Sequence, residues 1–293
     1  MRIGYLGPEG TFSGEALRAS GPPPGYEAVG LPTIHDTVMA VQEGTVDWAI
    51  VPIENSIEGS VDQTLDALAL DAPDVEIVGE AVHPVHHSLI AARELEPAEI
   101  RTVVSHPQVI GQCARFIRAL PSAHVETAPS TAEAVRSVAE RPDQGRAALG
   151  NRLSAELYGC LILRDRVEDH EDNETRFVWL GARAEGAGRG DEGASGLGEL
   201  RPGAAGAPRK TSLVFWGTGA SRPGWLVACL SEFASRQVNL TRIESRPRGH
   251  GLGRYMFFAD LEGSVLESPV ADAIAGLRGR CDDVRVLGSY PAA

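Results

Sequence analysis

The sequence predicts an α/β protein made of a long N-terminal region and a smaller C-terminal domain. Residues 1–181 alternate short apolar runs with segments of helical spacing, which is typical of α/β domains. Residues 182–209 are rich in Gly, Ala and Pro and have no hydrophobic period, so we expect a linker there. Residues 210–293 have the predicted order βαββαβ, the ferredoxin-like arrangement.

Each expected element of the N-terminal region follows from a local pattern. The expected strands are "RIGYLG", "DWAIVPIE", "IRTVVSHP" and "RAALG". The expected helices are "TFSGEALRAS", "VDQTLDALAL", "QVIGQCARFIRAL", "NRLSAELYG" and "STAEAVRSVAE", the last with a Glu placed as in a capping box. This alternation predicts mainly parallel sheets, and ligands of open α/β sheets bind beyond the carboxyl ends of the strands.

The C-terminal domain has its own series of elements. The expected strands are "TSLVFW", "VNLTRIESRP", "RYMFFADLEG" and "VRVLGSY". The expected helices are "GWLVACLSEFASR" and "SPVADAIAGLRGR". Together they give the two βα halves of a ferredoxin-like unit.

Composition argues against several classes of protein and of chemistry. The chain has 293 residues and a formal charge of −13, which argues against a nucleic-acid or an anionic membrane partner. No apolar run reaches the roughly 18 residues of a transmembrane helix, and the start "MRIGYLGPEG" lacks the apolar region of a secretory signal. Lys210 is the only lysine, which excludes Schiff-base chemistry and a Walker phosphate loop from the region before it.

The cysteines and histidines predict neither a disulfide framework nor a metal site. The four cysteines lie far apart without a C-x-x-C pair, which fits reduced thiols in a cytoplasm. The segment "HPVHH", residues 83–87, is the nearest approach to a ligand cluster, but its proline and apolar flanks are typical of a crossover strand. We therefore expect no metal.

Polar side chains follow several of the expected strands. They are Glu54, Asn55 and Ser56 after one strand, Ser105, His106 and Gln112 after another, Glu9 and Thr11 after the first, and Thr175, Arg176 and Phe177 in "DNETRFVWLG". Taken singly, each group is also explained as a helix cap, an ordinary turn or a strand edge. Because loops at one end of an α/β scaffold converge, the groups together favour a site for a small anion such as a carboxylate.

The motifs at these positions resemble those of the prephenate dehydratase family. They are "GYLGPEGTFS", "VPIENSIEGSV", "SHPQVIGQC", "STAEAV", "AALGNRLSAELYG" and "DNETRFVWLG" in order, with "RIESRP" resembling the ESRP motif of a regulatory ACT domain. The resemblance covers almost the whole chain apart from the linker. It implies decarboxylation and dehydration of prephenate to phenylpyruvate in L-phenylalanine biosynthesis, without a cofactor. It also implies two α/β lobes like type II periplasmic binding proteins, and homodimers or homotetramers.

The resemblance assigns roles to residues at the matching positions. It implies that Thr175 assists the departure of hydroxide, which leaves poorly without a proton or a strong hydrogen bond. It further implies that Arg176 holds a carboxylate or orients the site. The other residues that match the active site are Glu54 and Asn55 in the catalytic group and Ser56, Ser105, Gln112, Thr11 and Phe177 near the substrate, with packing as the alternative for Phe177.

The same resemblance implies an L-phenylalanine site in the ACT domain. The matching residues are Gly224, Trp225, Leu226, Glu244, Ser245, Arg246 and Pro247. Trp225 departs from the family pattern, in which alanine is usual, so its indole is expected either to fill the pocket or to turn outward into an interface. Three alternatives to the dehydratase remain: an arrogenate dehydratase, a prephenate decarboxylase-like enzyme that lacks the threonine, and a non-catalytic sensor of small acids.

Overall fold

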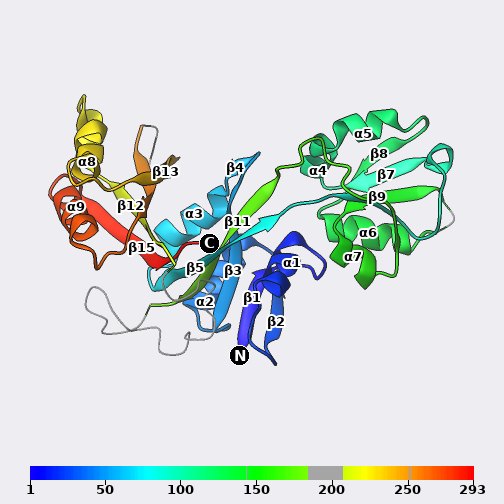
Figure 1. Ribbon diagram of the computed structural model, residues 1–293, viewed down its shortest axis with the longest axis horizontal. Coiled ribbons are helices and arrows are strands. Elements are labelled where there is room, and N and C mark those ends of the chain that lie inside the picture. The colour runs from blue at the N-terminus through cyan, green and yellow to red at the C-terminus, as the bar shows by residue number, and fades with distance from the viewer. Residues whose placement is uncertain (143, 184–206, 250, 252) are drawn as a thin grey trace.

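The computed structural model describes residues 1–142, 144–183, 207–249, 251 and 253–293. Three bodies lie in a row along the longest axis of the molecule (Figure 1). The first lobe, with both chain termini near it, is in the middle, the second lobe is at one end and the C-terminal domain is at the other. Among the described residues, no helix combines the length and the apolar character needed to cross a membrane.

The first lobe is built on a sheet with the strand order β2-β1-β3-β11-β5, and β4 pairs with β3. Its strands are β1 (Arg2–Leu6), β2 (Glu27–Leu31), β3 (Trp48–Asn55), β4 (Gly59–Ser60), β5 (Val75–Pro84) and β11 (Glu174–Ala182). Its helices are α1 (Phe12–Ala19), α2 (Ile34–Gln42) and α3 (Asp62–Asp66), which continues into a π-helical turn at Ala67–Asp71. Strands β1, β2 and β3 are parallel, whereas β11 runs antiparallel to both β3 and β5.

The two faces of this sheet are covered differently, and side chains of β11 alternate between them. On one face, Phe177 and Trp179 pack with Leu17 of α1. On the other face, Val178 and Leu180 join a core that also contains residues of α2, α3 and the C-terminal domain. Consecutive residues of β11 therefore belong to different environments.

The second lobe has a sheet of order β10-β6-β9-β7-β8. Its strands are β6 (Ser88–Ala91), β7 (Thr102–Ser105), β8 (His124–Thr127), β9 (Arg146–Gly150) and β10 (Leu161–Arg164). Its helices are α4 (Pro107–Gln112), α5 (Ala114–Ala119), α6 (Thr131–Ala139) and α7 (Arg152–Leu157), and a 3-10 turn spans Pro97–Glu99. Helices α4 and α5 pack on one face of the sheet, and α6 and α7 on the other.

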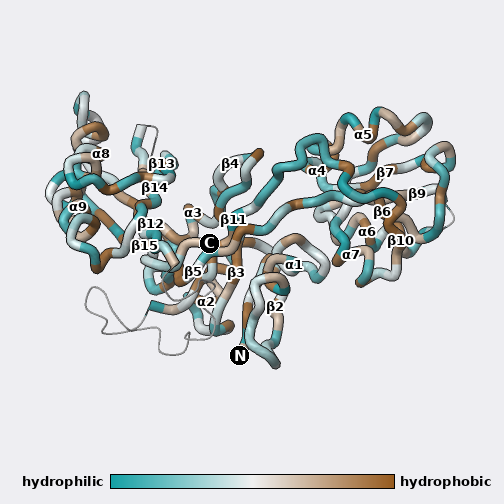
Figure 2. The backbone as a smooth tube through the Cα atoms, in the orientation of Figure 1, coloured by the Kyte–Doolittle hydropathy of each residue, from teal (hydrophilic) through white to brown (hydrophobic). Residues whose placement is uncertain are grey.

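The chain crosses between the lobes twice. It leaves β5 for β6 through residues 85–87 and returns from β10 to β11 through residues 165–173. Figure 2 shows these connecting segments as hydrophilic, whereas apolar residues gather in the sheets of the two lobes. The return as β11 explains why the first-lobe sheet is mixed rather than mainly parallel, because β11 enters it antiparallel to β3 and β5. The second-lobe sheet is mixed because β6, which arrives from the first lobe, is antiparallel to both β9 and β10.

The C-terminal domain has the βαββαβ order expected from its sequence. It consists of β12 (Arg209–Trp216), α8 (Trp225–Ala234), β13 (Leu240–Pro247), β14 (Tyr255–Glu262), α9 (Ser268–Arg278) and β15 (Asp283–Pro291), with a 3-10 turn at Thr218–Ser221. The sheet order is β13-β14-β12-β15, so β13 is an edge strand. Most of the predicted linker, residues 182–209, lies outside the described residues.

The sheet of the C-terminal domain packs directly on the first lobe. Val214, Phe258, Leu287 and Tyr290 belong to the same buried core as the strands and helices of that lobe. The backbones approach so closely that a Cβ added at Gly288 of β15 would lie 2.1 Å from the carbonyl oxygen of Ile77 in β5. The C-terminal domain is thus attached to the sheet that carries β11.

Candidate active site

Thr175 stands at the start of β11, hydrogen-bonded to the end of β3. The two strands pair so that Thr175 lies opposite Asn55 and Arg176 lies opposite Glu54. The Nδ2 atom of Asn55 donates to Thr175 Oγ1 at 2.9 Å. Thr175 is 9% exposed, so its hydroxyl is largely withdrawn from bulk water.

The turn after β3 fixes the orientation of the Asn55 amide. Its Oδ1 accepts hydrogen bonds from the backbone N–H groups of Ile57 and Glu58, both at 3.0 Å. Because only the oxygen of an amide accepts, the NH₂ group must point toward Thr175. Thr175 Oγ1 therefore acts as the acceptor in this pair, and its own proton remains available for another acceptor.

A hydrogen-bond network joins Thr175 to the second lobe. Asn55 Nδ2 also donates to Asn173 Oδ1 at 2.8 Å, and Asn173 Nδ2 donates to Gln112 Oε1 at 3.4 Å. Gln112 Nε2 in turn donates to Glu58 Oε1 at 3.1 Å, across the junction between the lobes. The structure thus brings Thr175, Asn55 and Gln112, three of the predicted site residues, into one network, and it adds Asn173 and Glu58.

His87 ends this network as a buried, neutral donor. Its ring Nε2 lies 2.9 Å from Gln112 Oε1, and since that oxygen is an acceptor, the proton belongs on Nε2. The side chain is 1% exposed and contacts the ring of Phe12 edge-on. Burial lowers the pKa of His87, and the hydrogen bond to Gln112 and the charge of Glu168 only partly oppose this effect.

Gln112 owes its position to an interruption of the expected helix. The pattern "QVIGQCARFIRAL" predicts one helix, but the structure has two, α4 and α5, which meet at Cys113. Asp169, on the segment returning to the first lobe, donates its backbone N–H to Gln112 O at 2.7 Å. Its carboxylate accepts from the backbone N–H of Arg115 at 3.1 Å, as a cap for α5. Gln112 is therefore the last residue of α4.

Arg176 and Glu54 lie on the opposite face of the sheet from Thr175 and Asn55. Arg176 Nη2 donates to Asp260 Oδ2 at 2.6 Å and Nη1 donates to Glu80 Oε2 at 3.1 Å. Its Nε lies 3.2 Å from Glu54 Oε2, as an ion pair without the alignment of a hydrogen bond. The structure does not bring Arg176 or Glu54 together with Thr175, because alternation along β3 and β11 directs them toward the C-terminal domain.

The remaining predicted residues of the site are placed as structural supports. The Ser56 hydroxyl accepts a hydrogen bond at 3.0 Å from the backbone N–H of Glu174, at the start of β11. The Ser105 hydroxyl, fully buried, donates to Leu149 O at 2.8 Å. Thr11 is the N-cap of α1, and Phe177 is a core residue that is 1% exposed.

The histidines of "HPVHH" have separate partners. His83 Nε2 lies 3.4 Å from Glu15 Oε2, and His86 Nδ1 lies 2.9 Å from Glu168 Oε1. Together with His87, they border the first crossing between the lobes. Within the described parts of the chain, no group of three or more His, Cys, Asp or Glu side chains has a metal-binding arrangement.

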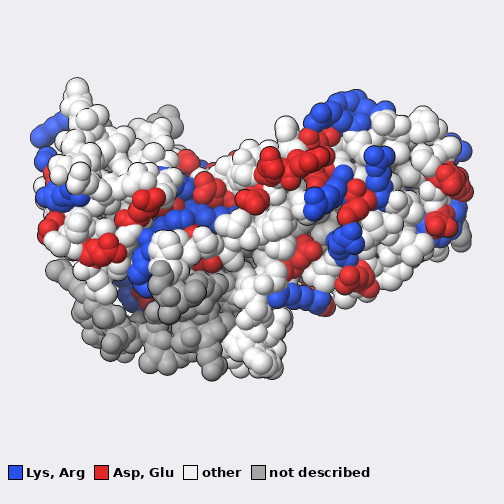
Figure 3. Space-filling model, viewed as in Figure 1, with Lys and Arg blue, Asp and Glu red and all other residues white. Residues whose placement is uncertain are grey.

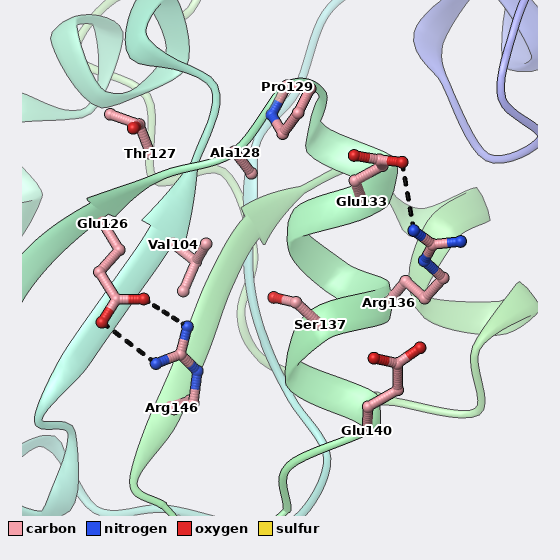
Figure 4. A pocket seen from close by; sticks show the side chains of 10 residues that line it. All are labelled: Val104, Glu126, Thr127, Ala128, Pro129, Glu133, Arg136, Ser137, Glu140 and Arg146. Carbon is pink, nitrogen blue, oxygen red and sulfur yellow. Dashed lines mark hydrogen bonds and ion pairs between the residues drawn. The ribbon is translucent and has the colours of Figure 1, made fainter.

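A separate polar hollow lies on the second lobe, between α6 and strands β7, β8 and β9 (Figure 4). Arg146 forms a bidentate pair with Glu126, with nitrogen–oxygen distances of 3.2 and 2.6 Å. Arg136 pairs with Glu133 along the helix. The hollow contains none of the predicted site residues, and it is distinct from the Thr175 network.

Comparison with known proteins decides the family. Residues 3–185 match the family model described as prephenate dehydratase. The chain belongs to the prephenate dehydratase family. A prephenate dehydratase of Amycolatopsis methanolica is 40% identical over 293 residues, which cover 100% of this chain and 89% of that relative.

Two solved structures are similar to this chain over almost its whole length. A prephenate dehydratase from Arthrobacter aurescens in complex with L-Phe is 33% identical, with a TM-score of 0.83 and coverage of 99% of this chain and 90% of that one. A structure described as GqqA, a novel type of quorum quenching acylase, is 29% identical, with a TM-score of 0.84 and coverage of 100% and 98%. In both comparisons, the similarity extends over the C-terminal domain of this chain.

In this member of the prephenate dehydratase family, Trp225 turns into its own domain. Its Nε1 donates to Arg280 O at 2.9 Å, and its ring packs on Phe257 and Phe215. A Cβ at Gly219 would lie 2.2 Å from the indole, so glycine is needed there to make room. Gly224, with φ of 81°, adopts the left-handed conformation at the start of α8, and Leu226 is half-buried.

Every second residue of the ESRP segment in β13 faces the first lobe. Glu244 accepts from the Ser60 hydroxyl at 2.8 Å, and Arg246 pairs with Asp66 at 2.7 Å and with Asp62. Ser245 and Pro247 are exposed on the other face of this edge strand. The four predicted phenylalanine-site residues that lie on β13 are therefore divided between its two faces.

Asn173, Glu58 and His87 are members of the site network that the sequence analysis did not select. Asn173 stands two residues before Thr175 inside the same motif, so its position was a usable signal. Glu58 and His87 meet Gln112 only because the two lobes come together. Nothing in the sequence near either residue indicated that contact.

Proposed function

We propose that this chain is a prephenate dehydratase, which decarboxylates and dehydrates prephenate to phenylpyruvate in the biosynthesis of L-phenylalanine. Family membership supports the reaction, and one observation carries the site. The Thr175 hydroxyl accepts from an amide whose orientation is fixed, which leaves its proton free for a substrate oxygen.

The chemistry follows from that arrangement. Loss of carbon dioxide sends the electrons of the broken C–C bond into the ring, and they leave with the ring hydroxyl as its C–O bond breaks. Thr175 donates a hydrogen bond to that departing oxygen, because hydroxide is a poor leaving group. The hydrogen bond from Asn55 stabilises negative charge that develops on Thr175 Oγ1. Aromatisation of the ring makes the reaction thermodynamically favourable. Gln112, on the second lobe, and Asn173, at the end of the segment that returns to the first lobe, are proposed to orient the substrate.

Of the two roles that the motif implied for Arg176, holding a carboxylate and orienting the site, this proposal keeps only the second. Its guanidinium is already paired with Glu80 and Asp260, on the face away from Thr175. The carboxylates of prephenate would instead meet amide and hydroxyl donors at the junction of the lobes. We therefore propose that Arg176 and Glu54 support the site without touching the substrate.

The test is direct assay of the purified protein with prephenate. Appearance of the phenylpyruvate absorbance supports the dehydratase, and a parallel assay with arrogenate measures the preference between the two substrates. Release of carbon dioxide without an aromatic product would indicate a prephenate decarboxylase-like reaction. Binding of prephenate without turnover would indicate a sensor of small acids.

An acylase reaction is not proposed, although one structural neighbour is described as an acylase. Acyl transfer requires a nucleophile within hydrogen-bond reach of a base. Of the hydroxyls that the motifs place at the candidate site, Ser105 is buried and donates to a backbone carbonyl, and Thr175 is held by an amide. Neither hydroxyl has a base as its hydrogen-bond partner.

We further propose that the C-terminal domain is an ACT domain that binds L-phenylalanine between paired copies and inhibits the enzyme. The βαββαβ order, the left-handed Gly224 and the relative solved with L-Phe support this. The proposal implies a homodimer or homotetramer, and cytoplasmic residence is consistent with four free cysteines. Calorimetry with L-phenylalanine tests binding and sedimentation tests assembly. If no heat is observed, binding by Trp225→Ala would identify the indole as the obstacle.

A further inference from the structure

Four charged side chains form a cluster between the first lobe and the C-terminal domain, and we call them the cross-domain quartet. Glu80 and Arg176 come from β5 and β11, and Lys210 and Asp260 come from β12 and β14. Lys210 Nζ donates to Glu80 Oε1 at 2.7 Å, and Arg176 Nη2 donates to Asp260 Oδ2 at 2.6 Å. Each body thus supplies one acid and one base, and two of the ion pairs cross the boundary.

The two carboxylates of the quartet are buried, and each accepts a further hydrogen bond. Glu80 is 2% exposed and Asp260 is 3% exposed. The Ser212 hydroxyl donates to Asp260 Oδ1 at 2.6 Å, and the backbone N–H of Ala293 donates to Glu80 Oε1 at 3.0 Å. A buried ion pair is costly to break because the remaining charge stays without compensation. The quartet therefore favours one relative arrangement of the two bodies.

Basic and acidic side chains lie side by side where the C-terminal domain meets the central lobe (Figure 3). Burial is the largest single influence on the pKa of Arg176 and acts to lower it, but the charge and hydrogen bond of Asp260 together with Tyr290 and Glu80 outweigh it, so the pKa is raised. Arg176 therefore remains a permanent cation at this boundary.

Both members of the hydrogen bond between Thr175 and Asn55 have a neighbour that is tied to the C-terminal domain. Arg176 follows Thr175 and pairs with Asp260. Glu54 precedes Asn55, and its carboxylate lies 3.2 Å from Arg176 Nε and 3.7 Å from Arg242 Nε of β13. Displacement of the C-terminal sheet would therefore pull on β3 and β11 directly beside the reacting hydroxyl.

From this geometry we propose that Arg176 and Asp260 are positioning residues through which the C-terminal domain controls Thr175. The inference rests on the proposed function, since the signal is the binding of L-phenylalanine and the response is dehydratase activity. The route is short: C-terminal sheet, Asp260, Arg176, and then the adjacent Thr175. It explains how a domain that does not reach the Thr175 network can still change its geometry.

The test compares Asp260→Asn with Asp66→Asn. Asp66 pairs with Arg246 at the same domain boundary, but it lies on α3 and not on a strand that carries the site. In Asp260→Asn we expect turnover without phenylalanine to stay within about 3-fold of wild type. The phenylalanine concentration for half-inhibition should rise at least about 10-fold, while its dissociation constant by calorimetry changes less than about 2-fold. Asp66→Asn should match wild type in turnover, in the phenylalanine concentration for half-inhibition and in the dissociation constant for phenylalanine.

Hydrogen exchange gives a readout that does not depend on phenylalanine. Exchange in the peptide covering residues 172–181 should be faster in Asp260→Asn than in wild type, and unchanged in Asp66→Asn. If Asp260→Asn does not fold, Ser212→Ala removes a donor to Asp260 Oδ1 and is expected to shift half-inhibition and exchange in the same direction by a smaller amount. Wild-type protein that ignores phenylalanine would count against the proposed regulation alone, and the exchange measurement would then decide the role of Asp260.

Three results would overturn the inference. The first is wild-type inhibition together with wild-type exchange in Asp260→Asn. The second is an equal loss of inhibition in Asp66→Asn, which would indicate general loosening of the domain boundary. The third is loss of phenylalanine binding itself in Asp260→Asn, which would place Asp260 in the effector site.

Discussion

At the scale of single residues, the TRF triplet divides its functions among three environments. Thr175 faces the junction of the lobes, Arg176 faces the C-terminal domain and Phe177 fills the core beside α1. The cause is the two-residue period of a strand, which sends neighbours to opposite faces of a sheet. A short motif can therefore place a proposed reacting hydroxyl, a structural cation and a packing residue in three different environments.

Replacement of Thr175 tests the reacting group. In Thr175→Ala the proton donor is lost while the strand and its packing remain, so we expect turnover to fall by about 10²–10⁴ with nearly unchanged stability and substrate binding. Single-turnover kinetics and thermal melting measure the two properties. Thr175→Ser keeps the hydroxyl and serves as the matched control, with an expected loss of less than about 10-fold. Near-normal turnover in Thr175→Ala would contradict the role of the hydroxyl.

The pH dependence of stability tests His87. Its pKa is lowered in the folded state by burial, whereas in the unfolded chain it lies near the ordinary value of about 6.5. Below that value the unfolded state binds a proton that the folded state resists. The contribution of His87 is therefore complete above about pH 6.5 and is lost as the pH falls, with a slope of at most about 1.4 kcal/mol per pH unit.

Urea unfolding at pH 7 and pH 5 measures this effect. We expect His87→Gln to lose less of its free energy of unfolding between these values than wild type does. His170 is exposed, so His170→Gln should keep the wild-type dependence. Identical slopes in His87→Gln and wild type would show that His87 does not titrate differently in the two states.

At the scale of elements, β5 and β15 determine how closely the C-terminal domain approaches the first lobe. Gly288→Ala would place a Cβ 2.1 Å from the backbone carbonyl oxygen of Ile77, and a backbone atom cannot move aside as a side chain can. We expect a loss of about 1–3 kcal/mol in the free energy of unfolding, measured by chemical denaturation. In Gly111→Ala the added Cβ on α4 meets open space, so that control should gain up to about 1 kcal/mol from helix propensity. Equal stability of Gly288→Ala and wild type would argue against such a tight contact.

At the scale of the whole molecule, three bodies meet around one sheet, and the sheet carries the reacting strand. Coupling between L-phenylalanine and substrate must then be reciprocal. Using Thr175→Ala, which is expected to bind prephenate without consuming it, we predict that saturating prephenate weakens phenylalanine binding by about 5–150-fold. Phenylalanine should weaken prephenate binding by the same factor. Calorimetric titration in both orders measures it, and two independent affinities would show that the sites are uncoupled.

The sequence by itself determined the elements of the C-terminal domain and the family. Periodicity predicted the βαββαβ order of residues 210–293, because each strand and helix there has a complete local pattern. The motifs at the strand ends identified the family that the comparison confirms. Of the candidate active site, they indicated Thr175, Asn55 and Gln112, which share one network, because each stands in a motif beside a strand end.

Only the tertiary structure decided those features that depend on contacts between distant parts of the chain. Asp169 divides the expected helix into α4 and α5, and it does so through hydrogen bonds to residues more than fifty positions earlier. Arg176 was expected either to hold a carboxylate or to orient the site, and the partner that holds it, Asp260, belongs to another domain. His87 becomes a site residue only when the lobes meet. A sequence pattern records local propensity and burial, whereas the pairing of charges and amides across a boundary is set by how three folded bodies pack.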